Sequence, residues 1–280
     1  MKKITFLLVL FAFMLLCLNV FAAGNQPFDV KVEGKGKQTI LLIPGFASSG
    51  DVWNETISAF SADYKCYKLT MPGFAGVKAQ ENPDLKQWVE AISEFIKTEK
   101  MGQPIVIGHS MGAVMTMMLA SKHPEQVSKI VLVDGLPCLP AVFNPSFKSA
   151  ENPDCSASVN QFTQMSDEAF KRGQSTAVKR LTADTSKFET VLNWSLQSDR
   201  KTIGKLFCDM SNTDLRSQIA SIKCPSLVLL EAPFKQFAVA LEAQFAQLKG
   251  AQLKYADKGL HFIMFDDKEW YLKQLSAFIK

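Results

Sequence analysis

The sequence predicts an α/β fold: a mostly parallel central sheet with helices on both faces and an inserted helical cap. Short apolar runs alternate with helical patterns along the chain, as parallel strands and their connecting helices do. The first run, residues 38–43, ends in four consecutive apolar residues, which is typical of a strand covered on both faces. Later in the chain, one apolar run ends at Gly135 and the next begins after Lys223. About ninety residues separate them, far more than an ordinary crossover needs.

Each element of this pattern can be located along the chain. We expect strands at residues 38–43, 65–70, 104–108, 127–135, 224–232 and 251–257. Apolar residues at helical spacing predict helices at residues 50–64, 82–100, 112–125, 235–249 and from about Asp267 onward.

The long interval contains helical patterns of its own. They lie at residues 166–181, 188–199 and 200–210, and the regular spacing of Phe188, Val191 and Leu192 disfavours a meandering loop. We therefore expect an inserted helical cap at residues 135–223. The core domain would comprise residues 23–134 and 224–280.

The N-terminus has the pattern of a secretory signal peptide. Two lysines precede a long apolar run, and small residues follow it, so we expect residues 1–22 to be removed after Ala22. An uncleaved membrane anchor is the alternative, whereas a lipoprotein anchor at Cys17 is disfavoured by the bulky Leu16 before it. The protein is then exported, either periplasmic or secreted, with no further apolar stretch to span a membrane.

Charge and cysteine content limit the classes of partner. The formal net charge of +4 includes Lys2 and Lys3, and no dense basic run is present, so nucleic acid is not an expected partner. No Cys-x-x-Cys motif or Cys/His cluster suggests a structural metal, and no phosphate-binding glycine loop suggests a cofactor. Cleavage leaves five cysteines, whose pairing the sequence does not reveal, nor does it reveal the oligomeric state: Cys66, Cys138, Cys155, Cys208 and Cys224.

One short motif carries the chemistry. Residues 108–112, Gly-His-Ser-Met-Gly, fit the pattern Gly-x-Ser-x-Gly and lie between an apolar strand and a helix of small residues. Flanking glycines allow strand and helix to approach closely, while the turn lifts the Ser110 hydroxyl above the strand end. The start of the following helix supplies unpaired N–H groups that favour a developing negative charge. The motif therefore indicates a nucleophilic serine at Ser110.

At this point the chain resembles the α/β-hydrolase family. The resemblance runs from about residue 38 to the C-terminus and is carried by "LLIPGF", "GHSMG" and "GLHFIMFDD". It implies the α/β-hydrolase fold, in the branch with a serine nucleophile and a helical cap, and places the nucleophile at Ser110. A serine at this position argues against the branches that use a carboxylate nucleophile.

A serine nucleophile needs a base, and the sequence has three histidines. His109 adjoins the nucleophile and should pack near the turn, and His123 lies at a helix end before a proline. His261 follows the last strand, where the family places its base. Elimination and resemblance agree on His261 as the general base.

Three carboxylates are candidates for the acid that supports this base. The family resemblance implies an acid just beyond the strand at 224–232, near residue 234, but that residue is Phe234. Asp134 ends the preceding strand, 24 residues after Ser110, and is the first candidate. Glu231 is the alternative, since its longer side chain extends its reach, and Asp257 is a third candidate.

Two backbone groups are expected to form the oxyanion hole. One is the N–H of Met111, directly after the nucleophile. By resemblance the other is the N–H of Phe46, in the loop "PGFASS" after the first predicted strand. The similar "MPGFAG" at residues 71–76 is expected to be structural.

The predicted site implies a serine hydrolase that acts on an acyl ester-type bond: a carboxylic ester, a thioester or a lactone. The cap is rich in apolar residues, so we expect a small-molecule acyl substrate of moderate apolarity. Two alternatives from other classes remain: a ligand-binding protein on the same scaffold, and a non-hydrolytic lyase or perhydrolase-like enzyme. The cap residues in question are Phe143, Phe147, Phe162, Met165, Phe170, Trp194, Leu206, Phe207 and Met210.

Overall fold

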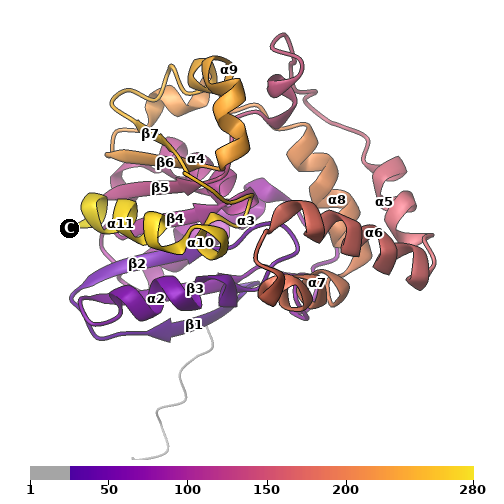
Figure 1. Cartoon of the computed structure of the whole chain (residues 1–280), viewed down its shortest axis with the longest axis horizontal. Helices are drawn as coiled ribbons and strands as arrows, with labels where there is room; N and C mark the ends of the chain where they lie inside the picture. The colour runs from indigo at the N-terminus through magenta and orange to yellow at the C-terminus, as the bar shows by residue number, and fades with distance from the viewer. Residues whose placement is uncertain (1–25) are drawn as a thin grey trace, which may run out of the picture.

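A computed structural model describes residues 26–280, and the predicted signal peptide therefore lies outside the described residues. Seven strands form one sheet in the order β1-β3-β2-β4-β5-β6-β7 (Figure 1). Neighbouring strands from β3 to β7 are parallel, whereas β1 pairs antiparallel with β3 at one edge. This mostly parallel sheet confirms the predicted fold class. The strands are β1 Asp29–Glu33, β2 Gln38–Ile43, β3 Tyr64–Thr70, β4 Ile105–His109, β5 Lys129–Val133, β6 Ser226–Leu230 and β7 Gln252–Tyr255.

Strand β2 shows why its sequence is continuously apolar. Successive side chains of a strand point to opposite faces of the sheet. Leu41 and Ile43 belong to the hydrophobic core on one face, and Ile40 and Leu42 to the core on the other. All four are fully buried, so the sheet needs a helical layer on each side.

Helices supply these two layers. Helices α3, α4 and α9 pack on one face, and α2, α10 and α11 on the other. In Figure 1, α2, α10 and α11 lie in front of the sheet. Trp88 of α3 and Trp53 before α2 are both fully buried, one in each core. The bounds are α2 Asn54–Phe60, α3 Leu85–Thr98, α4 Met111–Lys122, α9 Ala238–Gln244, α10 Ile263–Asp266 and α11 Lys268–Ile279.

The interval between β5 and β6 is helical in the structure. We use the name helical cap for residues 135–223. Its helix α8 begins against the loop after β3, where Asp199 N donates to Gly73 O at 2.7 Å. Its helix α6 ends against the loop after β7, where Phe262 N donates to Leu181 O at 3.0 Å. The helical cap thus touches loops at the carboxyl ends of the strands. Its helices are η3 Leu139–Val142, α5 Ser156–Thr163, α6 Asp167–Leu181, η4 Thr185–Lys187, α7 Phe188–Leu196, α8 Arg200–Ser211 and η5 Gln218–Ser221.

Strand β1, helix α5 and the segment at residues 232–244 differ from the sequence expectation. The edge strand β1 was not expected, because four of its five residues are exposed and show no apolar run. Helix α5 was also not expected, since none of its residues is buried. The helix predicted at residues 235–249 is instead a 3-10 turn, Ala232–Phe237, followed by the short α9.

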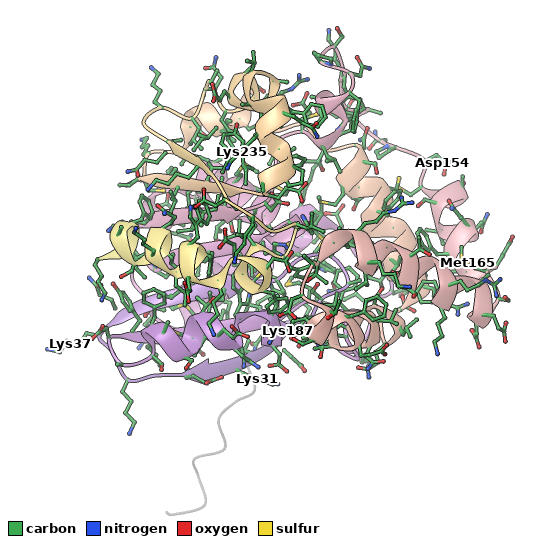
Figure 2. All side chains as sticks on the ribbon, in the orientation of Figure 1. Lys31, Lys37, Asp154, Met165, Lys187 and Lys235 are labelled. Carbon is green, nitrogen blue, oxygen red and sulfur yellow. A yellow bond between two sulfur atoms is a disulfide. The ribbon has the colours of Figure 1, made fainter. Side chains whose placement is uncertain are left out.

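Cys155 and Cys208 form a disulfide within the helical cap, whereas Cys66, Cys138 and Cys224 are free. From residue 26 to the C-terminus, no helix combines the length and hydrophobicity needed to cross a bilayer. The side chains that fill the space between sheet, helices and helical cap are drawn in Figure 2.

Candidate active site

Ser110 lies in a strained turn between β4 and α4. Its backbone has φ 53° and ψ −117°, a conformation that non-glycine residues rarely adopt. Ser110 N donates to Val133 O at 2.8 Å, and Ser110 O accepts from Ala113 N and Val114 N at the start of α4. The ends of β5 and α4 thus hold the serine in this conformation, as is typical of a functional turn.

The two glycines of the motif make room for this turn. A Cβ atom on Gly108 would lie 2.2 Å from the carbonyl oxygen of Gly112. A Cβ atom on Gly112 would lie 2.2 Å from the carbonyl oxygen of Ile43. Either contact is far shorter than real Cβ atoms allow, so only glycine lets β4, α4 and the end of β2 meet here.

His261 and Asp134 are in direct contact. His261 Nδ1 lies 2.6 Å from Asp134 Oδ2, and the Asp134 side chain is only 1% exposed. The other carboxylate oxygen, Oδ1, accepts the backbone N–H of Glu231 at 2.8 Å. Each oxygen of this buried carboxylate therefore has a donor, and the contact keeps the hydrogen on His261 at Nδ1, which leaves Nε2 free to accept a proton.

The charge of Asp134 changes the pKa of His261. Burial alone would lower the pKa of the imidazole, but the hydrogen bond and the charge of Asp134 outweigh it and raise the pKa. The charge of Glu231 acts in the same direction. His261 is thus a stronger base than a free imidazole, and its side chain remains 22% exposed to solvent.

In the described chain, neither of the other two acid candidates forms a hydrogen bond or ion pair with His261. Among the described residues, the Glu231 carboxylate makes no hydrogen bond, and only its backbone N–H reaches Asp134. Burial, followed by the nearby charge of Asp134, raises the pKa of Glu231 to about 7. Asp257 is 78% exposed and pairs with Lys235 at 3.8 Å. Of the three candidates, the structure brings Asp134 to His261.

His109 is a neighbour of both Ser110 and His261. His109 is the last residue of β4, directly before Ser110, and its ring centroid is 4.6 Å from that of His261. Within the described part of the chain, Ser110 Oγ and His261 Nε2 form no hydrogen bond. Both residues are partly exposed. Catalytic hydrogen bonds of this kind often tighten only when substrate is bound.

The expected oxyanion donors are backbone groups beside Ser110. Met111 is the first residue of α4, so its N–H has no partner within the helix. No turn or loop hydrogen bond in residues 26–280 uses the N–H of Phe46. A Cβ atom on Gly45 would lie 3.2 Å from Ser110 Cβ, which places the Phe46 loop directly against the serine turn.

Comparisons with known proteins agree with this architecture. The family model for the alpha/beta hydrolase fold matches residues 38–267. The chain belongs to the α/β-hydrolase fold family. Pimeloyl-[acyl-carrier protein] methyl ester esterase of Vibrio atlanticus is 27% identical over 203 residues, which cover 71% of this chain and 76% of that protein. The names of the relatives of this chain support its assignment as a hydrolase.

Two solved structures show the same fold at low sequence identity. The enol-lactonase from Burkholderia xenovorans superposes with a TM-score of 0.75 at 15% identity, covering 90% of this chain and 96% of the other. The esterase from Exiguobacterium antarcticum gives a TM-score of 0.73 at 17% identity, covering 90% and 94% of the two chains.

In this α/β hydrolase, His109 has a role that the sequence did not indicate beyond packing near the turn. Its Nε2–H donates to the backbone oxygen of His261 at 3.0 Å, and its ring also packs on Phe262 at 4.9 Å. Burial and the charge of His261 lower the pKa of His109 well below its usual value, so the ring is neutral. His109 thus holds the backbone of His261 in place.

Asp266 and Asp267 also organise the His261 loop. Asp266 Oδ2 accepts from Leu260 N at 2.8 Å, and its carboxylate also accepts from Ala183 N and Asp184 N of the helical cap. Asp267 Oδ2 accepts the N–H groups of the two residues that follow Ala256. These aspartates end the motif "GLHFIMFDD", but only the folded chain shows which backbone groups they bind.

No metal centre accompanies these residues in the described chain. From residue 26 onward, His, Cys, Asp and Glu side chains form no group of three or more suited to a metal ion.

Proposed function

We propose that this α/β hydrolase cleaves acyl ester-type bonds, in carboxylic esters, thioesters or lactones, through a covalent acyl-serine intermediate. Ser110 is the nucleophile, His261 the general base and Asp134 the supporting acid. The observation that carries the proposal is the 2.6 Å contact between His261 Nδ1 and Asp134 Oδ2, beside a serine held at φ 53°.

The first half of the reaction forms the acyl-enzyme. His261 Nε2 takes the proton of the Ser110 hydroxyl while Oγ attacks the acyl carbonyl carbon. Negative charge then develops on the carbonyl oxygen, where the N–H groups of Phe46 and Met111 stabilise it. Asp134 stabilises the imidazolium that forms. When the tetrahedral intermediate collapses, the C–O or C–S bond breaks and the imidazolium gives its proton to the leaving group.

The second half releases the acid. His261 Nε2 takes a proton from a water molecule, and the resulting hydroxide attacks the acyl carbon. The bond between this carbon and Ser110 Oγ breaks, and the serine recovers its proton from His261. The raised pKa of His261 makes it a stronger base for both proton transfers.

Ester chemistry has support from the relatives and from the helical cap. The matching protein of Vibrio atlanticus is named a methyl ester esterase. Phe207 of the helical cap is 51% exposed, so its ring is not part of the core of the helical cap. It supports a small-molecule acyl substrate of moderate apolarity.

Labelling with a fluorophosphonate tests this function. The probe phosphonylates an activated serine, so it should modify Ser110, and the modification should be absent in Ser110→Ala and in His261→Ala. A panel of p-nitrophenyl esters and lactones should then yield the carboxylic acid. Absence of labelling would favour a ligand-binding protein, and a product other than the acid would favour a lyase or perhydrolase.

We also propose that the protein is exported. The support is the signal-like sequence of residues 1–22 together with the disulfide between Cys155 and Cys208, since disulfides persist in oxidising compartments. N-terminal sequencing of protein recovered outside the cytoplasm should begin at Ala23. Recovery of the full chain in the cytoplasm would contradict export.

A further inference from the structure

One aromatic ring of the helical cap lies beside Phe46, whose N–H is a proposed oxyanion donor, and a second ring lies beside the first. The ring centroid of Phe207, on α8, is 6.5 Å from that of Phe46. The ring of Phe162, on α5, is 6.1 Å from that of Phe207. Phe207 therefore connects the oxyanion loop to α5 through two aromatic contacts.

Phe207 is exposed although its neighbours on α8 are not. Leu206 is fully buried and Ile203 is 1% exposed, so this face of α8 serves the core. Phe207 points elsewhere and is 51% exposed. An exposed aromatic side chain next to a reactive group is a candidate contact for an apolar part of a ligand.

The order of the strands indicates which part of an ester faces Phe207. His261 and Asp134 lie on the β5–β7 side of Ser110, and Phe46 follows β2 on the other side of β4. His261 must protonate the leaving group, so the leaving group faces the β5–β7 side. The carbonyl oxygen faces the N–H groups of Phe46 and Met111, so the reacting carbon lies close to Phe46. With Ser110 Oγ, this oxygen and the leaving group placed, the acyl chain is the remaining substituent that can contact Phe207.

Helix α5 depends on α8 for its position. It has eight residues, none of them buried, and so short a helix is unstable alone in water. Ser158 Oγ donates to Gly204 O at 2.8 Å, and a Cβ atom on Gly204 would lie 2.6 Å from Val159 Cα. The two helices are therefore in close backbone contact, and Phe162 is held against α8.

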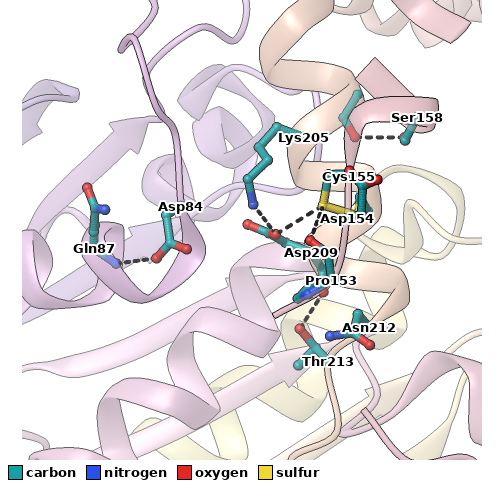
Figure 3. Close-up of polar contacts among 12 residues, drawn as sticks. Asp84, Gln87, Pro153, Asp154, Cys155, Ser158, Lys205, Asp209, Asn212 and Thr213 are labelled. Atoms are coloured by element: carbon teal, nitrogen blue, oxygen red, sulfur yellow. Dashed lines mark hydrogen bonds and ion pairs between the residues drawn. A yellow bond between two sulfur atoms is a disulfide. The ribbon is translucent and has the colours of Figure 1, made fainter. Parts of the chain in front are cut away.

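The disulfide links α5 to α8 covalently, next to Phe207. Cys208 directly follows Phe207 on α8, and Cys155 directly precedes α5. The neighbourhood of this bond is drawn in Figure 3, with Lys205 and Asp209 of α8 forming an ion pair next to it. The covalent link thus joins the start of α5 to the residue beside the aromatic contact.

We propose that Phe207, held beside Phe46 by the Cys155–Cys208 disulfide and supported by Phe162, selects substrates with an extended apolar acyl chain. The inference rests on the proposed function, because it needs Ser110 to take up the acyl group. It assigns specificity to Phe207 and assigns the disulfide the role of fixing its position.

The test is the ratio of kcat/KM for p-nitrophenyl octanoate to that for p-nitrophenyl acetate. Dividing one by the other removes the concentration of active enzyme, so a partly unfolded variant still gives a valid ratio. We expect Phe207→Ala to lower the ratio about tenfold, since lost apolar contact mainly affects the longer chain. Phe207→Leu should keep it within about threefold, because leucine retains apolar surface.

Matched control variants test whether the change in the ratio is specific to Phe207 and to the disulfide. Phe143→Ala removes an exposed phenylalanine elsewhere in the helical cap and should leave the ratio within about twofold of the original protein. Cys208→Ser should lower the ratio about threefold or more by releasing α5. Cys224→Ser removes a free cysteine and should leave the ratio unchanged.

An unchanged or increased ratio in Phe207→Ala would overturn the proposal, and an increase would mean that Phe207 blocks long chains. An unchanged ratio in Cys208→Ser would overturn the role of the disulfide. Labelling of Ser110 by ethyl and decyl fluorophosphonates distinguishes failure of the proposed function from failure of this inference. If neither probe reacts, the proposed function fails; if both react with rates that Phe207→Ala changes equally, only this inference fails.

Discussion

Asp134 Oδ2 lies 2.6 Å from Nδ1 of His261, although 127 residues separate the two along the chain. The sheet order explains this contact. Asp134 follows β5 and His261 lies in the loop after β7, with β6 between them. The first residue after β6, Glu231, donates its backbone N–H to Asp134, so all three strand ends meet at this carboxylate.

Replacing the charge of Asp134 should disable the base. We expect Asp134→Asn to lower kcat about 10⁴-fold, the order found for this change in serine proteases.

The catalytic imidazole must be neutral, and Asp134 raises its pKa, so activity of the unmodified protein falls as pH drops through that raised pKa. In Asp134→Asn this acidic limb should move to lower pH. A kcat profile from pH 5 to 9 measures both effects. Near-normal turnover, with collapse in Glu231→Gln, would assign the acid to Glu231.

Glu231 should make the folded state less stable as pH rises. Its pKa of about 7 exceeds that of an unfolded glutamate, so between about pH 4.5 and 7 the folded state binds more protons and the free energy of unfolding falls. Glu231→Gln removes this term. Urea unfolding at each pH gives the free energy of unfolding of the variant minus that of the original protein. This difference should be about 1–2 kcal/mol larger at pH 8 than at pH 5. The exposed Glu94→Gln should show no such difference.

Gly112 should not tolerate a methyl group. A Cβ atom there would lie 2.2 Å from Ile43 O, so Gly112→Ala should lower the free energy of unfolding by about 1–3 kcal/mol and displace the serine turn. Gly173 is also within a helix, α6, but has nothing within 4 Å of its Cβ position. Gly173→Ala should therefore be neutral or stabilising by up to about 1 kcal/mol. Urea unfolding of both variants makes the comparison; equal effects would contradict it.

Asp266 should couple the helical cap to the His261 loop. Asp266→Ala leaves Leu260 N, Ala183 N and Asp184 N without their acceptor, so we expect a loss of about 2–4 kcal/mol in stability and a fall in kcat. The exposed Asp257→Ala is the control and should change stability by less than about 0.5 kcal/mol. Unchanged kcat in a folded Asp266→Ala protein would show that His261 does not need this support.

Much of the fold could be predicted because its main elements are strongly buried. Four consecutive apolar residues in β2 require cover on both faces, and that requirement is local in sequence. The elements that were missed lack this signal. Strand β1 is exposed at the edge, and α5 is held from outside by α8 rather than by its own apolar face.

The candidate site divides in the same way. Ser110 has a local motif, and its strand–turn–helix context is visible in sequence. The choice among Asp134, Glu231 and Asp257 has no local signature, because each is a carboxylate near a strand end. The contacts of His109 and Asp266 with the His261 loop likewise join segments that are distant in sequence.

By itself, the order of residues determined the alternation of strands and helices, the long helical insertion and the serine turn, because burial and backbone conformation depend on neighbouring residues. Only the tertiary structure decided which carboxylate reaches His261, which cysteines pair and which aromatic rings lie beside Phe46. The physical reason is that hydrogen bonds, disulfides and ring contacts act over a few ångströms. Which residues come that close depends on how the sheet is ordered and on how α5 and α8 pack.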